Sequence, residues 1–457
     1  MFRNRFNRSI LIVVLLFIML LSACAAPATP TEPPPAEPVA TVPPVVEPVP
    51  PTEEPPAEPV TIEWWTVPSE EYSEEAQRAL AKAFEEAHPN IKVNVTILPE
   101  SGFSEKMTTV LGSGEGAPDV AFFWDNNWLP QALDLTPFIE RDNFDYTMYF
   151  PGFWNTRALW DDKVVGLPLG VGANFVMYNK DVFDEMGVAY PASDLTTEEW
   201  NELVVQVNYP EMKRWGGDRP RGPFRAIFYN YGARPFSDDS MTVEGFLNGP
   251  EAVAAYTWLW DLVNTNATPT TADLEVLGTE GTGPVDLFLA GRLAMATLNQ
   301  GHLLNAIEAG ANFGVVPEPQ VEGNERYVNA WSLTASIWAG TERPDEAWEF
   351  LKFWVGPEGQ EFLMLNGNLF PSIPEVLQKS PHSDLEAVQE FFKVLEFSQV
   401  AEWTTERPCN SVVLRAARPV WDKIMLNEVA RDQIKAELDA VVPDAQAALD
   451  ECRARFE

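Results

Sequence analysis

Aromatic, amide and acid side chains follow two apolar segments that the sequence predicts as strands. The motif Trp124-Asp125-Asn126-Asn127-Trp128 comes directly after the predicted strand 119–123, and Asn299-Gln300-Gly301-His302 follows a second predicted strand. In α/β sheets, small molecules bind at the carboxyl ends of strands. Amides and acids offer planar hydrogen-bonding groups, and tryptophan offers a flat apolar face. These residues could therefore bind a small molecule reversibly. A capped loop packed by its own tryptophans is the alternative interpretation of 124–128.

Residues of the same types elsewhere extend the candidate site. Trp65 ends the first predicted strand, Asn174 lies in a long uncharged segment, and Asn329 and Trp331 lie within 327–335. His302 also fits a loop residue that faces water. The candidates for stacking are Trp65, Trp124 and Trp331, and the candidates for hydrogen bonding are Asp125, Asn126, Asn174, Asn299, Gln300, His302 and Asn329.

Catalytic and metal-binding motifs are missing from the sequence. The chain has 3 histidines, and neither a His-Glu-x-x-His pair nor a Gly-x-Ser-x-Gly motif occurs. The glycine-rich loop 112–116 lacks the Lys-Ser/Thr pair of a phosphate-binding loop. A glycosidase needs two carboxylates about 5–10 Å apart, and the 68 acidic residues single out no such pair. We therefore expect a binding protein without enzymatic activity, cofactor or metal.

The segment 160–187 is expected to position the candidate site. Residues 164–177 carry no charge and contain three glycines and a proline, followed by a turn and a helix from Lys180 to a terminating Gly187. A strand of this kind could run from one lobe into another, with a ligand lying across it. An ordinary buried strand in a one-piece α/β domain is the alternative.

The first folded residues predict a β-α-β unit. Residues 61–65 form a predicted strand, Ser73 could cap a helix that ends near His88, and residues 91–98 alternate as a second strand. This order favours a sheet covered by helices. A chain of 457 residues exceeds the usual size of a single core, so two lobes are expected.

The N-terminus predicts export and attachment to a membrane. Three arginines precede the apolar run 10–21, and small residues then lead to Cys24. This end resembles a bacterial lipobox, which implies that Cys24 carries lipid. A plain signal peptide or a transmembrane anchor is the alternative. Residues 27–59 are rich in proline and glutamate and predict an extended tether.

Charge and cysteine content fit a protein outside the cytoplasm. The net charge of −37 argues against nucleic acid as a partner and against docking on anionic lipid through charge. With Cys24 used by lipid, Cys409 and Cys452 remain as an even pair, and we expect a disulfide between them. Spacing does not establish that bond, which depends on the geometry of the two side chains.

Six motifs in order resemble those of the family-1 extracellular solute-binding proteins, the sugar-binding components of bacterial ABC importers. The resemblance covers almost the whole chain after the tether. The motifs are Phe84 with Pro89-Asn90-Ile91-Lys92-Val93, Gly116-Ala117-Pro118-Asp119-Val120, Gly166-Leu167-Pro168, Tyr178-Asn179-Lys180-Asp181-Val182-Phe183, Phe288-Leu289-Ala290-Gly291-Arg292-Leu293-Ala294-Met295, and the helix 347–354.

The resemblance implies an α/β fold of the two-lobed periplasmic-binding-protein type II, with a hinge and with each lobe a sheet flanked by helices. The expected division is a lipoprotein signal peptide at 1–24, a disordered tether at 25–59, a first lobe of 60–170 with 313–342, and a second lobe of 171–312 with 343–457. The family often has a tryptophan that stacks on sugar where this sequence has His302.

The function implied by the resemblance is capture of a carbohydrate by closure of the two lobes, followed by delivery to the permease subunits of an ABC importer. The protein would be a monomer, held by the lipid on Cys24 outside the cytoplasm. A receptor for another solute, such as a polyamine or a peptide, and a secreted carbohydrate-active enzyme are the alternatives. A pocket lined by carboxylates rather than amides would favour a polyamine.

Overall fold

The computed structural model describes residues 59–68, 73–150, 158–160, 163–219, 225–276, 283–396 and 409–454. All of them belong to one compact unit, Ala57–Glu457. The predictions for Cys24 and for the tether lie outside the described residues, and so does the side chain of Asn126.

The N-terminal elements form the predicted β-α-β unit. Strand β1 pairs in parallel with both β2 and β3. The hydroxyl of Ser73 accepts a hydrogen bond from the backbone N–H of Ala76 at 3.2 Å, so this serine caps α1 as predicted. The elements in chain order are β1 (Val60–Thr66), α1 (Glu74–Ala87), β2 (Ile91–Ile97), α2 (Glu100–Ser113), β3 (Val120–Phe122) and α3 (Thr136–Asp142).

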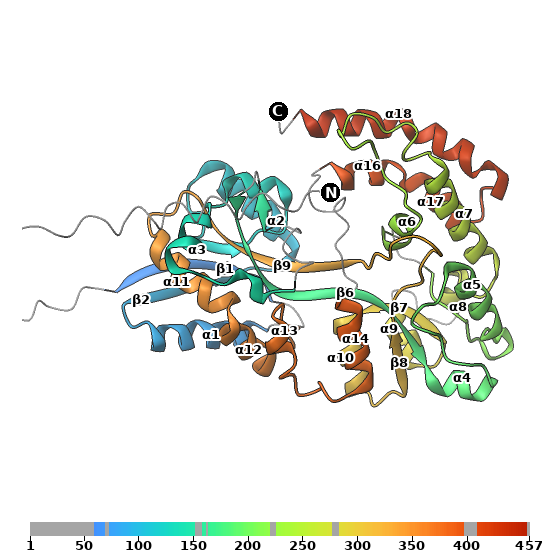
Figure 1. Cartoon of the computed structure of the whole chain (residues 1–457), viewed down its shortest axis with the longest axis horizontal. Helices are drawn as coiled ribbons and strands as arrows, with labels where there is room; N and C mark the ends of the chain where they lie inside the picture. Colours follow the sequence, from blue (N-terminus) through green and yellow to red (C-terminus); the bar gives the residue numbers. More distant parts are fainter. Residues whose placement is uncertain are drawn as a thin grey trace, which may run out of the picture. The chain divides into compact units, whose positions relative to one another are not determined.

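Strand β6 (Leu167–Asn179) connects the two halves of the sheet. Its residues 167–173 pair with β9 (Ala330–Ile337), which in turn pairs with β3. Its residues 174–178 pair with β7 (Met295–Asn299), and residues 176–179 pair with β8 (Phe313–Val316) on the other side. Figure 1 shows β6 and β9 running side by side between two groups of elements. The long uncharged segment is thus a linking strand.

Three hydrophobic cores lie along this sheet. The first core surrounds β1 and β3 and includes Trp64, whose ring centroid lies 4.8 Å from that of Trp354. The second and third cores share β6, because successive side chains of a strand point to opposite faces. Val176 belongs to the second core and Phe175 and Met177 belong to the third.

The remaining helices cover these cores. Alongside the first core lie α11 (Pro344–Val355), α12 (Pro357–Asn366) and α13 (Pro374–Leu377). The other helices belong to the half of the molecule that contains β7 and β8 (Figure 1). They are α4 (Lys180–Met186), α5 (Thr197–Gln206), α6 (Arg225–Asn230), α7 (Pro250–Asn264), α8 (Thr271–Val276), α9 (Pro284–Leu289), α10 (Gln300–Glu308), α14 (Glu386–Glu396), α16 (Asn410–Ala416), α17 (Arg418–Met425) and α18 (Ile434–Arg453).

The expected lobe boundaries differ from this packing in two places. Residues 313–342 were expected in the first lobe, but Val315 and Val316 of β8 belong to the third and second cores. Residues 343–457 were expected in the second lobe, but Trp348 and Trp354 of α11 belong to the first core. The apolar run 313–316 resembles a linking strand, whereas β9 makes the second connection.

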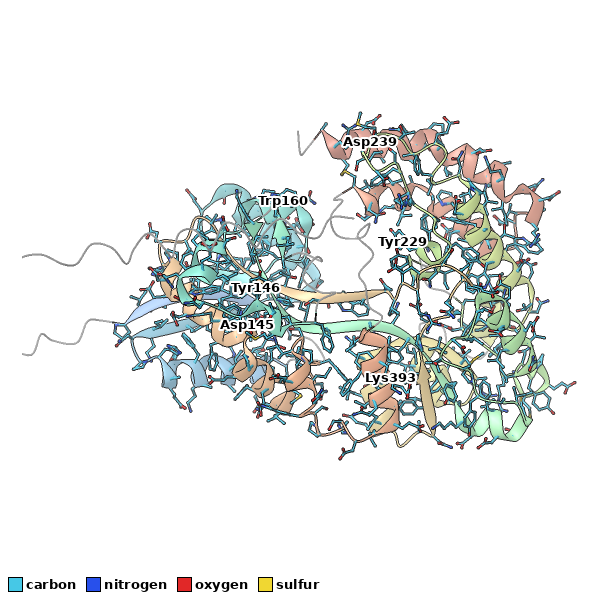
Figure 2. The ribbon with its side chains drawn as sticks, viewed as in Figure 1. Asp145, Tyr146, Trp160, Tyr229, Asp239 and Lys393 are labelled. Carbon is cyan, nitrogen blue, oxygen red and sulfur yellow. A yellow bond between two sulfur atoms is a disulfide. The ribbon has the colours of Figure 1, made fainter. Side chains whose placement is uncertain are left out.

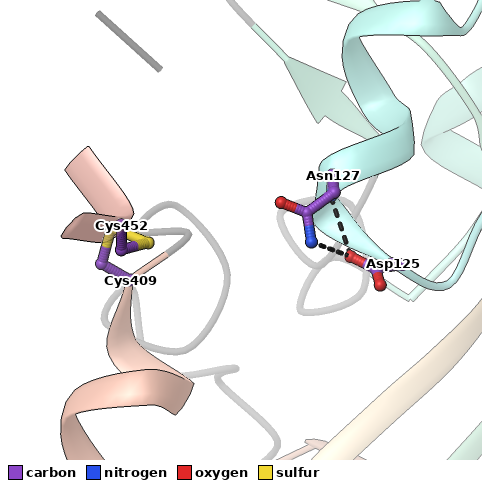
Figure 3. The surroundings of a disulfide bond; sticks show 4 residues. All are labelled: Asp125, Asn127, Cys409 and Cys452. Carbon is purple, nitrogen blue, oxygen red and sulfur yellow. Dashed lines mark hydrogen bonds between the residues drawn. A yellow bond between two sulfur atoms is a disulfide. The ribbon is translucent and has the colours of Figure 1, made fainter. Parts of the chain in front are cut away.

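A disulfide fastens the C-terminal helix. Cys409, just before α16, is bonded to Cys452 near the end of α18, and their Cα atoms lie 5.7 Å apart (Figure 3). This is the pair predicted from the sequence. Within the described part of the chain, no helix combines the length and the apolar character needed to cross a membrane.

Candidate functional site

A cavity of about 490 Å³ opens beside the junction of β6 and β7. Its walls come from β6 and β7, from α5, α6, α7, α10 and the start of α9, and from loop residues before α6 and after β8. Helix α6 is held by a hydrogen bond of 2.7 Å that Asn410 donates to the hydroxyl of Tyr229, a residue labelled in Figure 2. The polar lining residues are Asn174, Asp218, Thr297, Asn299, His302, Glu318 and Asn329, and the aromatic ones are Trp200 and Trp258.

Three asparagines meet where three strands come together. Asn174 of β6 lies opposite Asn299 of β7 in the antiparallel register. The backbone N–H of Asn174 donates to the carbonyl oxygen of Asn329 at 2.8 Å, just before β9 begins. The backbone pairing of the strands therefore gathers three amide side chains, each of which can both donate and accept hydrogen bonds.

Asn299 also fixes the orientation of His302. The Oδ1 atom of Asn299 accepts hydrogen bonds from the backbone N–H groups of Gly301 and His302 at 3.1 and 3.3 Å, which caps α10. In return, Nδ1 of His302 accepts from the backbone N–H of Asn299 at 3.3 Å. The neutral imidazole consequently carries its hydrogen on Nε2, where it can donate.

Two buried carboxylates lie on the cavity wall. Asp218 and Glu318 are each 8% exposed. One oxygen of Asp218 accepts from the backbone N–H of Thr297 at 3.1 Å, and Oε2 of Glu318 accepts from that of Asn329 at 3.5 Å. Burial raises the pKa of the Glu318 carboxyl to about 7, and the nearby charge of Asp218 acts in the same direction. Glu318 therefore changes its charge near neutral pH.

Tryptophans supply part of the apolar wall. Trp200 of α5 and Trp258 of α7 are 3% and 6% exposed, and the indole N–H of Trp258 donates to the carbonyl oxygen of Thr197 at 2.9 Å. Because that hydrogen bond holds the ring, its position does not depend on a ligand. The wall can therefore contact the apolar side of a small molecule without rearranging.

The structure brings four of the predicted residues together at this cavity: Asn174, Asn299, His302 and Asn329. Gln300 is buried, and its Oε1 atom accepts from the backbone N–H of Ala173 at 3.2 Å, so it holds β6 in place. The ring of Trp331 covers Gly172 of the paired strand and does not line the cavity.

The predicted residues of the first half are packed locally. The indole of Trp124 donates to the hydroxyl of Ser104 at 3.0 Å, and Lys106 lies 4.4 Å from the ring of Trp65. One carboxylate oxygen of Asp125 accepts from both the backbone and the side chain of Asn127 (Figure 3). The segment 124–128 thus has the geometry of a capped loop, and none of its described side chains lines the cavity. A role in ligand binding for Trp65, Trp124 and Asp125 stays a prediction.

Sequence reasoning missed most of the lining residues, among them the polar and aromatic ones Trp200, Asp218, Trp258, Thr297 and Glu318. A signal for Asp218 was its position after Gly216-Gly217, since a Cβ atom at Gly216 would lie 1.7 Å from the carbonyl oxygen of Val204. That glycine lets the loop approach α5 closely. A signal for Glu318 was its place between two prolines at the end of an apolar strand.

Metal binding finds no support at this cavity or elsewhere in the described ranges. Among those residues, no group of three or more His, Cys, Asp or Glu side chains could hold a metal ion. Amide, carboxylate, imidazole and indole groups around an enclosed space are instead suited to binding an organic solute through hydrogen bonds and apolar contact.

Curated proteins and solved structures include several that resemble this chain. The erythritol/L-threitol-binding protein of Mycolicibacterium smegmatis is 25% identical over 319 residues, which cover 62% of this chain and 65% of that protein. The alignment thus spans slightly less than two thirds of that relative. The chain covers a larger share of similar solved structures.

Two solved structures have the same fold. The sugar-binding protein MalE from Xanthomonas citri superimposes with a TM-score of 0.70 at 21% identity, covering 87% of this chain and 99% of that one. An ABC substrate-binding protein from Listeria monocytogenes, in complex with cycloalternan, gives a TM-score of 0.67 at 22% identity, covering 84% and 98%. The expected α/β periplasmic-binding-protein fold is confirmed.

The sequence model described as bacterial extracellular solute-binding protein matches residues 68–361, which are more than half of the 457 residues. This chain therefore belongs to the bacterial extracellular solute-binding protein family.

Proposed function

We propose that this protein is the receptor of an ABC importer and that it binds a sugar or a polyol in the cavity at the junction of β6 and β7. The observation that carries the proposal is the group of three asparagine side chains, from Asn174, Asn299 and Asn329, at the wall of a cavity of about 490 Å³. This volume lies within the range of about 300–1,000 Å³ that is usual for small-molecule sites.

Recognition would use the two faces of a polyhydroxylated solute. Its hydroxyl groups would exchange hydrogen bonds with the asparagine amides and accept one from Nε2 of His302. Its C–H groups would contact the indole rings of Trp200 and Trp258. An amide can accept one hydroxyl and donate to another, so three amides can discriminate among arrangements of neighbouring hydroxyls.

Closure of the two lobes would follow from the connection between them. Strands β6 and β9 form two links, and the segment between α13 and α14 makes a third crossing. A solute that contacts both lobes favours the closed state only by its difference in affinity between the two states. Trp65, Trp124, Asp125, Asn126 and Trp331 are the candidates for contacts outside the cavity. Gln300 would support the site indirectly through its hydrogen bond to β6.

Attachment and delivery complete the proposal. Cys24 would carry lipid, residues 25–59 would act as a tether, and the liganded monomer would deliver its solute to membrane permease subunits. The names of the relatives, which refer to sugars and polyols, support this solute class. Membership of a family of binding proteins supports binding without turnover.

A solute of another class is the second candidate. The cavity is lined by two carboxylates as well as three amides, and the two carboxylates would favour a polyamine. A peptide or a secreted carbohydrate-active enzyme has no specific observation in its favour.

A thermal-shift screen separates these candidates. The purified protein is heated with monosaccharides, oligosaccharides, linear polyols, polyamines and short peptides in parallel. A ligand at 100 times its dissociation constant stabilises the folded state by about 2.7 kcal/mol. We expect sugars or polyols to raise the melting temperature and to remain chemically unchanged. Stabilisation by polyamines or peptides alone, or conversion of a sugar into product, would contradict the proposal.

A further inference from the structure

The side chain of Glu318 lies at the cavity wall beside the three asparagines. It is 8% exposed and lines the cavity, and its Oε2 atom accepts a hydrogen bond from the backbone N–H of Asn329, which is one of the three. A solute that reaches the side chain of Asn329 therefore also comes close to the carboxyl group of Glu318.

This carboxyl group has hydrogen-bonding capacity that its surroundings leave open. An ionised carboxylate has about four acceptor positions. Within the described part of the chain, Oε2 receives only the long hydrogen bond of 3.5 Å from Asn329, and Oε1 receives none. The two flanking residues are Pro317 and Pro319, which have no backbone N–H to donate. Both oxygen atoms of Glu318 are thus able to accept from donors that enter the cavity.

The turn that carries Glu318 is held by other contacts. The side chain of Asn230 donates to the carbonyl oxygen of Pro319 at 3.2 Å. The backbone N–H of Gln320 donates to the carbonyl oxygen of Leu195 at 2.9 Å. These hydrogen bonds fix the backbone directly after Glu318, so its carboxyl group is placed at the cavity without being needed to hold the turn.

We propose that Glu318 binds the solute directly and selects a solute with two adjacent free hydroxyls, which donate to the two oxygen atoms of its carboxylate. The inference rests on the proposed function, because the remaining hydroxyls would contact the asparagines. An ionised carboxylate only accepts hydrogen bonds, and its paired oxygen atoms match two neighbouring O–H donors. Hydrogen bonds to a charged group are stronger than neutral ones, so Glu318 contributes to both affinity and selectivity.

Proton release provides a readout that a purely structural role would not affect. Burial raises the pKa of Glu318 to about 7, so at pH 6 the carboxyl is mostly protonated when the cavity is empty. Two hydroxyl donors favour the ionised form, and binding at pH 6 should therefore release up to about one proton. The other titratable groups among the described lining residues are Asp218 and His302, so a Glu318 variant is needed to assign the proton.

Calorimetry with D-glucose, L-arabinose, D-mannitol and erythritol tests the inference. Each parent solute is compared at pH 8 with derivatives that lack one hydroxyl group. At pH 6, the parents are titrated in two buffers of different ionisation enthalpy. We expect at least one parent to bind and to release a proton at pH 6. Removal of either of two adjacent hydroxyls should weaken its binding about tenfold or more at pH 8.

The variant Glu318→Gln assigns these effects, because it keeps the size of the side chain and removes the charge. It should bind the parent about tenfold more weakly at pH 8 and release no proton at pH 6. The loss caused by removing either adjacent hydroxyl should be smaller than in the wild type, since the contact is already weakened. The control is Glu308→Gln, an exposed acid on α10 that does not line the cavity, and it should behave as the wild type does.

The outcomes separate the inference from the proposed function. Wild-type affinity in Glu318→Gln would overturn the inference and leave the receptor function standing. Binding without proton release in the wild type at pH 6, which does not depend on the folding of any variant, would overturn it too. If none of the four parents binds, the inference fails, and the wider thermal-shift screen of sugars and polyols decides the proposed function separately.

Discussion

Asn299 has a structural role and a proposed binding role at the same time. Its Oδ1 atom accepts two backbone hydrogen bonds at the start of α10, while the residue lines the cavity. The cap therefore fixes the side chain, so that its Nδ2 group is held in one direction. A donor held in this way binds a solute without first losing conformational freedom.

Substitutions at Asn299 should separate the two roles. Asn299→Ala removes the cap and should lower the free energy of unfolding by about 1 kcal/mol, whereas Asn299→Ser keeps a capping oxygen and should cost less than about 0.5 kcal/mol. Both variants lack Nδ2 and should bind the solute more weakly. Urea unfolding and calorimetry measure the two effects. Wild-type affinity in Asn299→Ser would contradict the binding role.

Glu318 should make stability depend on pH. Its folded-state pKa of about 7 lies above the ordinary glutamate value of 4.5, so the folded state binds more protons between these pH values. The contribution of this group is fully present below pH 4.5 and is lost as the pH rises through 7. The loss is on the order of 3 kcal/mol at most.

The comparison with Glu318→Gln isolates that effect from other titrating groups. The free energy of unfolding of the wild type, relative to that of the variant, should decrease between pH 4.5 and pH 7.5 and then stay constant. Urea unfolding at four pH values measures it. A difference that does not change with pH, or that grows as the pH rises, would contradict the pKa assigned to Glu318.

At the level of elements, the linking strands depend on a close approach. A Cβ atom at Gly172 of β6 would lie 2.3 Å from Cε2 of Trp331 on β9. The absence of a side chain at this position lets the indole cross the neighbouring strand. The glycines of β6 therefore have a packing role in addition to any flexibility they provide.

Gly172→Ala should destabilise the protein by about 1–3 kcal/mol, because the methyl group must displace the ring. Adding Trp331→Ala should recover part of the loss, so the two changes should not be additive. Thermal and urea unfolding measure both. Gly112→Ala, where a Cβ atom meets nothing within 4 Å, is the matched control and should cost nothing. A fully additive double variant would contradict the contact.

The elements themselves could be predicted from local signals. Ser73 caps α1, Thr196 forms a capping box with Glu199, and Gly187 ends α4 in the left-handed conformation at φ 65°. Each signal acts over a few residues, so the sequence reveals it directly. The linking strand is different, because β8 and β9 are both uncharged and only the pairing of β9 with β3 distinguishes them.

At the level of the whole molecule, the site depends on topology. Asn174 and Asn299 are 125 positions apart in the chain and become neighbours only because β6 and β7 pair. Asn299 ends β7 and Asn174 lies within the uncharged strand β6, and both could be anticipated as amide groups on predicted strands. Asp218 and Trp258 belong to a loop and to a helix interior, where the same residue types usually cap or pack. Their part in the cavity follows from the fold alone.

The packing of the whole molecule also explains why Trp65, Trp124 and Asp125 do not line the cavity. Trp124 and Trp128 both contact Phe103, with ring centroids at 4.5 and 6.2 Å, and thus complete the first core. Tryptophan residues at a strand end can serve a core or a ligand, and their sequence context is the same in both cases. Only the packing of α2 against this loop separates the two roles.

The most direct measurement of the central claim is a crystal structure of the protein with the sugar or polyol that gives the largest thermal shift. We predict that the solute occupies the cavity beside β6 and β7, with hydroxyls hydrogen-bonded to the side chains of Asn174, Asn299 and Asn329. A solute bound elsewhere on the molecule, with this cavity empty, would contradict the account.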